Sequence, residues 1–187
     1  MAKSPIDLIE LLKLARDRRK SCVSTEYWTK TKNLLSHAYV DYKDIYVEYC
    51  KDKGEEYNDK VFYIFQHVLV FLMMSDGRVG YREYESYKVF CEFAKVEPLT
   101  KKDIAALYDR LTVDDLVQEL SLLGDLREYI EADNFEAMVQ GFCYFAIDDK
   151  KKLNKNQYYI LRGFFASYYD TCPDSWFAFK LKSMFSL

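Results

Sequence analysis

The chain has 187 residues, of which half are apolar and 30% are charged, a balance that fits one globular domain and excludes a disordered protein. The net charge of −3 at neutral pH argues against a nucleic-acid-binding protein, because such proteins normally present a basic face to the phosphates. The five cysteines stand 28 to 52 residues apart with no CxxC pair, which indicates neither a disulfide framework nor a zinc site.

The sequence also predicts a compartment. The N-terminus leads into Asp7 and Glu10 instead of an apolar core, so no secretory signal is expected. The longest apolar run, residues 61–74, contains Gln66 and His67 and is only 14 residues long, which is too short to span a bilayer. We therefore expect a cytoplasmic protein without a membrane span, in a reducing environment.

Helical periodicity and helix-start signals divide most of the chain into helices. The predicted helices span residues 5–20, 25–53, 58–74, 80–94, 101–110, 112–123, 125–131, 135–147, 154–167 and a last segment from 173. Two of them begin with a Thr-x-x-Asp capping signal, at Thr100 and at Thr112. No segment alternates between apolar and polar residues as a strand would. We expect an all-α fold.

Two of the predicted helices, residues 61–74 and 135–147, are apolar on nearly every side. A helix of this kind belongs in the middle of a bundle. The sequence thus predicts a single-domain helical bundle over residues 1–187, with these two helices packed together at its centre. The N-terminal helices within residues 1–55 are expected at the periphery.

A two-helix unit occurs twice at a constant offset of 74 residues. In the first copy an apolar helix is followed by Ser75-Asp76-Gly77-Arg78-Val79 and by a second helix that starts at Gly80. In the second copy, Phe135–Asp148 is followed by a lysine-rich turn and by a helix that starts at Asn154. Val79 corresponds to Leu153, Glu83 to Gln157 and Phe90 to Phe164. Such a repeat indicates a core of two related halves, over residues 56–170.

The turn between Asp76 and Glu83 has two interpretations. Gly80 fits an N-cap, and Glu83 three residues later can accept a hydrogen bond from the backbone N–H of that cap. Alternatively, Asp76 and Glu83 are metal ligands, as in the second half of a calcium-binding EF-hand loop. The first half of such a loop would fall on Leu72 and Met74, which cannot ligate calcium.

The second copy favours the capping interpretation. It keeps the capping geometry at Asn154 and Gln157 but has no carboxylate there. Glu83→Gln is therefore expected to cost less than about 1 kcal/mol, the size of one cap contact. No cofactor is expected, and a divalent cation would bind only weakly at Asp76 and Glu83.

No catalytic motif is visible. The chain has two histidines, His37 and His67, and His67 falls in the most apolar helix, where a core histidine with a satisfied hydrogen bond is expected. Asp148 and Asp149 could form a carboxylate pair, but the three lysines that follow favour a solvated turn. No H-E-x-x-H, G-x-S-x-G, P-loop or G-x-G-x-x-G motif occurs, so the sequence favours a protein without enzymatic activity and assigns no catalytic residue.

The first copy of the repeat resembles the TerB-like (tellurite-resistance-associated) family. The matching residues are Ser75, Asp76-Gly77, Val79, Gly80 and Glu83, within a resemblance that covers about residues 60–170. The second copy departs from the pattern by one inserted residue, no glycine and glutamine in place of glutamate. The resemblance implies a helical bundle, a bacterial stress-associated or membrane-associated complex, and cation binding.

The sequence therefore predicts a cytoplasmic protein–protein interaction module in a bacterial stress or defence assembly. Residues 103–136 hold ten acidic residues and only two basic ones, Arg110 and Arg127, for a local charge of −8. Helices from this segment are expected on one side of the fold, where they could dock a basic partner. Two alternatives remain: a metal-responsive sensor that uses Asp76 and Glu83, and an enzyme with a site assembled from scattered residues.

Overall fold

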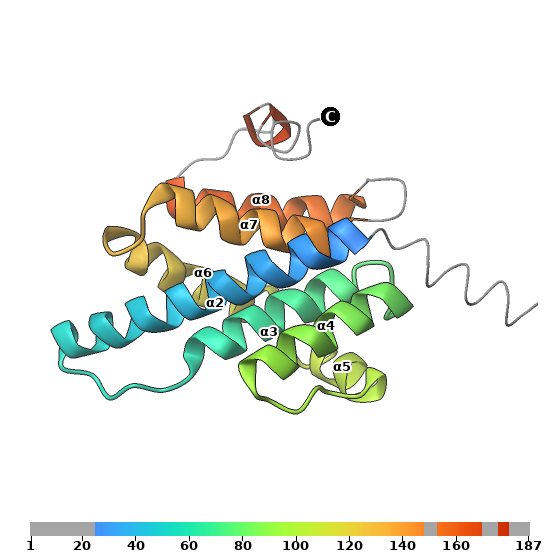
Figure 1. Cartoon of the computed structure of the whole chain (residues 1–187), viewed down its shortest axis with the longest axis horizontal. Coiled ribbons are helices and arrows are strands. Elements are labelled where there is room, and N and C mark those ends of the chain that lie inside the picture. Colours follow the sequence, from blue (N-terminus) through green and yellow to red (C-terminus); the bar gives the residue numbers. More distant parts are fainter. Residues whose placement is uncertain (1–24, 148–152, 170–175, 180–187) are drawn as a thin grey trace, which may run out of the picture.

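The computed structural model describes residues 25–147, 153–169 and 176–179 (Figure 1). Helices are the regular secondary structure in this part of the chain, which confirms the all-α prediction. The predicted first helix, residues 5–20, lies outside the described residues. The helices are α2 (Thr25–Lys53), α3 (Lys60–Met73), α4 (Tyr81–Ala94), α5 (Lys101–Tyr108), α6 (Val113–Asp125), the 3-10 turn η1 (Leu126–Glu128), α7 (Ala132–Ala146) and α8 (Lys155–Tyr169).

The helix ends follow the capping signals in the sequence. At the start of α5, the Thr100 hydroxyl accepts a hydrogen bond from the Asp103 N–H at 3.2 Å, and the Asp103 carboxylate accepts one from the Thr100 N–H at 3.3 Å. Thr112 and Asp115 form the same reciprocal pair at the start of α6. Each pair provides acceptors for two backbone N–H groups that have no partner within the helix.

One predicted helix is wrong. Asp125 is the last residue of α6, and between it and α7, which begins at Ala132, the chain forms only the single 3-10 turn η1. This short turn redirects the chain between α6 and α7, and it places both Leu126 and Ile130 in the core. A continuous helix would have kept these two side chains on a single helical face.

The two apolar helices α3 and α7 lie in the core and touch each other, as the repeat predicted. Their contact joins Phe65 and Phe142, whose ring centroids are 5.2 Å apart. Phe90 of α4 stacks against Phe65 at 5.9 Å, and Phe164 of α8 contacts Phe142 at 5.4 Å. A row of four buried phenylalanines thus crosses the fold in the order α4, α3, α7, α8, with the corresponding residues Phe90 and Phe164 at its ends.

The long helix α2 is not peripheral, which corrects the expectation for residues 25–53. It runs across both halves of the repeat (Figure 1), and Tyr39, Tyr42 and Tyr46 on its inner face are buried. A β-carbon at Gly141 of α7 would lie only 3.0 Å from the Leu35 side chain, so the glycine allows the two helices to approach closely. The physical reason for the central position is that α3 and α7 are apolar on several sides and need a further layer to cover them.

Candidate functional site

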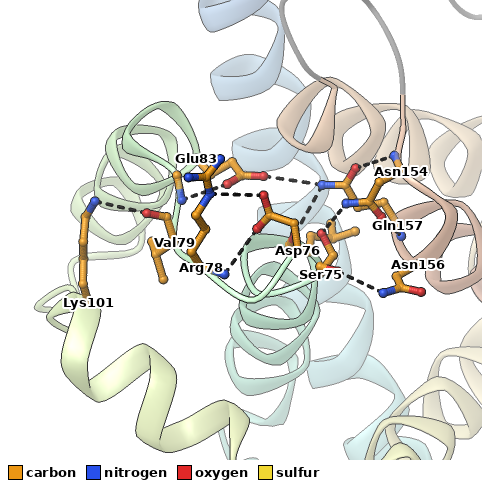
Figure 2. Close-up of polar contacts among 11 residues, drawn as sticks. Ser75, Asp76, Arg78, Val79, Glu83, Lys101, Asn154, Asn156 and Gln157 are labelled. Carbon is orange, nitrogen blue, oxygen red and sulfur yellow. Dashed lines mark hydrogen bonds and ion pairs between the residues drawn. The ribbon is translucent and has the colours of Figure 1, made fainter.

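The turn between α3 and α4 is held by its own polar groups (Figure 2). Gly77 has a φ of +83°, a left-handed conformation that glycine adopts without steric cost. The Asp76 carboxylate accepts a hydrogen bond from the Arg78 N–H at 3.3 Å, and it lies 3.6 Å from the Arg78 guanidinium. The carbonyl of Val79 accepts a hydrogen bond from the Lys101 ammonium at 3.2 Å. Asp76 itself is exposed to solvent.

Glu83 caps the start of α4, as predicted. Its Oε2 accepts a hydrogen bond from the Gly80 N–H at 3.2 Å. A β-carbon at position 80 would lie 2.5 Å from this oxygen, so glycine lets the carboxylate close against the cap. The capping interaction is therefore only the carboxylate half of a capping box, because Gly80 has no side chain to return a hydrogen bond.

The corresponding residue of the second copy, Gln157, contacts Glu83 directly (Figure 2). The Gln157 amide nitrogen donates to Glu83 Oε1 at 3.4 Å and to the Leu72 carbonyl at 3.3 Å. Gln157 also forms the complete capping box with Asn154: the Asn154 N–H donates to Gln157 Oε1 at 3.0 Å, and the Gln157 N–H donates to Asn154 Oδ1 at 2.9 Å. Two residues that are 74 positions apart in the repeat thus meet where the halves join.

Two further amides complete this junction. The Asn154 amide donates to the Ser75 hydroxyl at 2.7 Å, and the Asn156 amide donates to the Ser75 carbonyl at 2.9 Å. The sequence pattern assigns no role to Asn156 and does not predict that Ser75 faces the second copy. The available signal was the repeat itself, because residues at the same position of two symmetry-related units often meet near the axis that relates them.

Burial is the main influence on the charge of Glu83. The pKa of this carboxyl is raised from 4.5 to about 7, mainly by burial and also by the negative charge of Asp76. The Gly80 N–H and the guanidinium groups of Arg82 and Arg78 oppose the rise in pKa. Glu83 consequently exchanges its proton close to neutral pH, unlike an ordinary surface glutamate.

These contacts define what the junction can do chemically. Both oxygens of Glu83 accept hydrogen bonds from the protein. The negative charge of Asp76 also acts on the Glu83 carboxyl and contributes to its raised pKa. In the described ranges, no group of three His, Cys, Asp or Glu side chains is placed to hold a metal ion. The junction therefore ties the halves together, while cation binding by Asp76 and Glu83 stays a prediction.

His67 has the satisfied hydrogen bond that was predicted for it. Its Nδ1 lies 2.5 Å from Glu119 Oε1, in a half-buried pair that joins α3 to α6. Glu119 belongs to the acidic segment, residues 103–136. The pair links the two helices. Because Glu119 is bound to His67, it is not among the carboxylates that a partner protein would contact.

The acidic segment, residues 103–136, forms α5, α6, η1 and the first turns of α7. Some of its carboxylates have structural roles: Asp103 and Asp115 cap helices, and Glu136 accepts a hydrogen bond from the Tyr169 hydroxyl at 2.8 Å. Others are exposed to solvent, namely Asp109, Asp114, Asp125, Glu128, Glu131 and Asp133. We call these six residues the exposed carboxylates of the acidic segment.

Comparison with protein-family models found no match, and neither the curated proteins nor the solved structures contained a similar protein. Among the described helices, none combines the length and the apolar character needed to cross a bilayer.

Proposed function

We propose that this chain is a non-enzymatic protein-interaction module that docks a basic partner on its acidic segment. The observation that supports the proposal most strongly is the placement of charge. After the structural carboxylates are set aside, six acidic side chains of the segment remain exposed within 25 residues of sequence, from Asp109 to Asp133. Clustered charge of one sign attracts a partner of opposite charge and speeds their encounter.

The exposed face of α6 adds a geometric argument. Asp114, Val117, Gln118, Ser121 and Asp125 are all exposed, and their spacing of three, four, seven and eleven residues from Asp114 puts them on one side of the helix. The face is not uniformly polar, since Val117 is 57% exposed at its middle. A carboxylate near each end and an apolar residue between them suit a partner that combines basic and apolar side chains.

Among the described residues, His67, Cys91 and Cys143 lie in positions that do not suit catalysis. His67 is paired with Glu119. Burial raises the pKa of the Cys91 thiol to about 11 and also raises that of Cys143, so neither sulfur provides a thiolate nucleophile near neutral pH. These placements support a binding role over an enzymatic one. The assignment to a bacterial stress or defence assembly rests on the resemblance of the Ser75–Glu83 turn to the TerB-like family.

The test is affinity purification of the tagged full-length chain from cells of its own organism. One variant carries Asp109→Lys, Asp114→Lys and Glu131→Lys. All three sites are exposed, and none of them is the partner of His67. Asp109 stands at the C-cap of α5 and Glu131 at the N-cap of α7, where the Glu131 side chain makes no capping hydrogen bond. Asp115 and Glu119 are left unchanged, because reversing their charge would break a helix cap and the His67 pair.

A matched control carries Asp41→Lys, Glu92→Lys and Glu97→Lys, which change the net charge equally at exposed positions outside the acidic segment. We expect a stable partner to be recovered with the wild type and with the control, and to be depleted with the acidic-segment variant. Equal recovery with both variants would contradict docking on the acidic segment. The absence of any stable partner would contradict the interaction module itself.

A further inference from the structure

A hollow of about 820 Å³ lies between the C-terminal part of α2, the α6–η1 corner and α8. Four of its twelve lining residues are small: Ser121 and Gly124 from α6, and Gly163 and Ala166 from α8. Tyr49 and Tyr129 also line it, with their rings edge to face at 5.8 Å. This volume is large enough to receive several side chains of another molecule.

Gly163 of α8 leaves open space in the hollow. It sits inside α8, where a glycine costs about 1 kcal/mol relative to alanine. Its φ is not positive, and an added β-carbon would meet only Leu120 at an ordinary 3.7 Å. Gly141 differs, because a β-carbon there would press on Leu35 at 3.0 Å. Helix packing therefore explains Gly141, whereas neither backbone conformation nor helix packing explains Gly163, whose effect is to leave room in the hollow.

The charges around the hollow indicate what fits there. Val117, Ser121 and Asp125 belong both to its wall and to the exposed face of α6. Asp125 and Glu128 line the hollow, and the Tyr129 hydroxyl donates to Asp52 at 3.2 Å beside it. Lys53 and Arg127 also line it, and the Lys53 ammonium lies 5.7 Å from the centre of the Tyr49 ring. The lining itself is balanced, with two carboxylates and two basic groups. The excess of negative charge lies on the adjoining exposed face of α6, which carries Asp114 and Asp125 and has no basic residue.

We propose that this hollow receives an apolar side chain from a lysine- or arginine-bearing amphipathic helix of a partner protein. The apolar side chain would enter over Gly163 and Leu120, beside Val117, while basic residues of the partner helix meet Asp114 and Asp125. Helix-in-groove recognition of this kind uses a few apolar anchors and a charged rim. The inference rests on the proposed function, since it names the partner element and the place where it docks.

The experiment uses the full chain and two fluorescein-labelled amphipathic helical peptides, one of leucine and lysine and one of leucine and glutamate. Fluorescence anisotropy measures their affinities for the wild type and for variants of the hollow. Gly163→Leu places a leucine side chain in the part of the hollow next to Leu120, and Gly163→Ala is its control because the added methyl group fits at an ordinary distance. Val117→Ser removes the apolar wall, and Val40→Ser, at another exposed valine on α2, is its control.

We expect the leucine–lysine peptide to bind more tightly than its leucine–glutamate counterpart. Gly163→Leu should weaken that binding by about tenfold, as the loss of one anchoring side chain does, and Gly163→Ala and Val40→Ser should leave it unchanged. Circular dichroism and thermal unfolding of each variant establish that it is folded. Val117→Ser should weaken binding without filling the hollow, which covers the case in which Gly163→Leu unfolds the chain.

Other results would overturn the inference. Equal affinity for the two peptides, or for Gly163→Leu and Gly163→Ala, would show that the hollow is not the docking site. If the lysine substitutions at Asp109, Asp114 and Glu131 abolish binding but Gly163→Leu does not, the inference fails while the proposed function stands. If the chain alone sediments as a dimer that Gly163→Leu dissociates, the occupant is a second copy and the inference is again wrong.

Discussion

Replacing Glu83 by glutamine removes an ionisable group from the place where the two halves of the fold meet. Burial raises the pKa of this carboxyl from 4.5 to about 7. Because each pKa unit corresponds to about 1.4 kcal/mol, keeping Glu83 ionised in the folded chain costs about 3 kcal/mol relative to the unfolded chain. Glutamine resembles the protonated side chain and carries no such cost.

The substitution also has a structural cost. Glutamine can still accept the hydrogen bond from the Gly80 N–H, but its amide nitrogen would face the amide nitrogen of Gln157, which now donates to Glu83 Oε1. The loss of one such contact costs about 1 kcal/mol. We therefore expect Glu83→Gln to stabilise the folded chain by about 1–2 kcal/mol at pH 8. Burial thus reverses the sign of the small loss that capping alone predicts.

The dependence on pH is the sharper test. Because the pKa is raised in the folded state, the folded chain binds its proton more tightly than the unfolded chain. The contribution of Glu83 to stability is fully present below pH 4.5 and is lost as the pH rises through about 7. The difference in unfolding free energy between Glu83→Gln and the wild type should therefore grow in favour of the variant across this window.

Urea unfolding of both proteins at intervals between about pH 5 and pH 8 measures this difference directly. Glu92→Gln, at an exposed position on the same helix α4, is the control and should follow the wild type at every pH. Parallel curves for Glu83→Gln and the wild type would refute the assigned burial of the charge. So would a loss of more than about 1 kcal/mol at pH 8.

Three further predictions follow from the core, the thiols and the turn. Phe65→Ala and Phe142→Ala should each lower the free energy of unfolding in urea by about 3–5 kcal/mol, because each leaves a cavity in the buried row of rings. A loss of stability as small as that of a substitution at an exposed site would contradict their central position. Cys91 and Cys143 should react with iodoacetamide only as fast as the chain unfolds, because both are buried with raised pKa values; mass spectrometry that finds rapid labelling of the folded chain would disprove this. Micromolar calcium or zinc should not shift the melting temperature, whereas calorimetric binding abolished by Glu83→Gln would favour a metal-responsive sensor.

Much of the fold could be predicted because it follows from local signals. The Thr-x-x-Asp sequences predicted the starts of α5 and α6, and the 74-residue offset predicted the matching helix pairs. The central position of α2 was missed. Its inner face carries tyrosines such as Tyr42 and Tyr46, which are buried here but which sequence patterns do not separate from half-exposed aromatic residues.

The candidate site was predictable only in part. The capping role of Glu83 depends on residues three positions apart, and local spacing is sufficient to recognise it. The contact between Glu83 and Gln157 depends on how the halves pack, which the repeat suggests but does not determine. The hollow beside Gly163 arises where three separate helices meet, and a single glycine in a helical sequence carries no sign of the space around it.

The association rate of the chain with its purified partner tests the central claim of an acidic docking surface most directly. Stopped-flow measurement at low and at high salt would compare the wild type, the Asp109, Asp114 and Glu131 lysine variant, and the matched control at Asp41, Glu92 and Glu97. Exposed charges steer encounter strongly at low ionic strength and little once salt screens them. The account predicts that the acidic-segment variant associates more slowly than both other proteins at low salt, and that the difference shrinks at high salt. An association rate at low salt that is the same for all three proteins would contradict it.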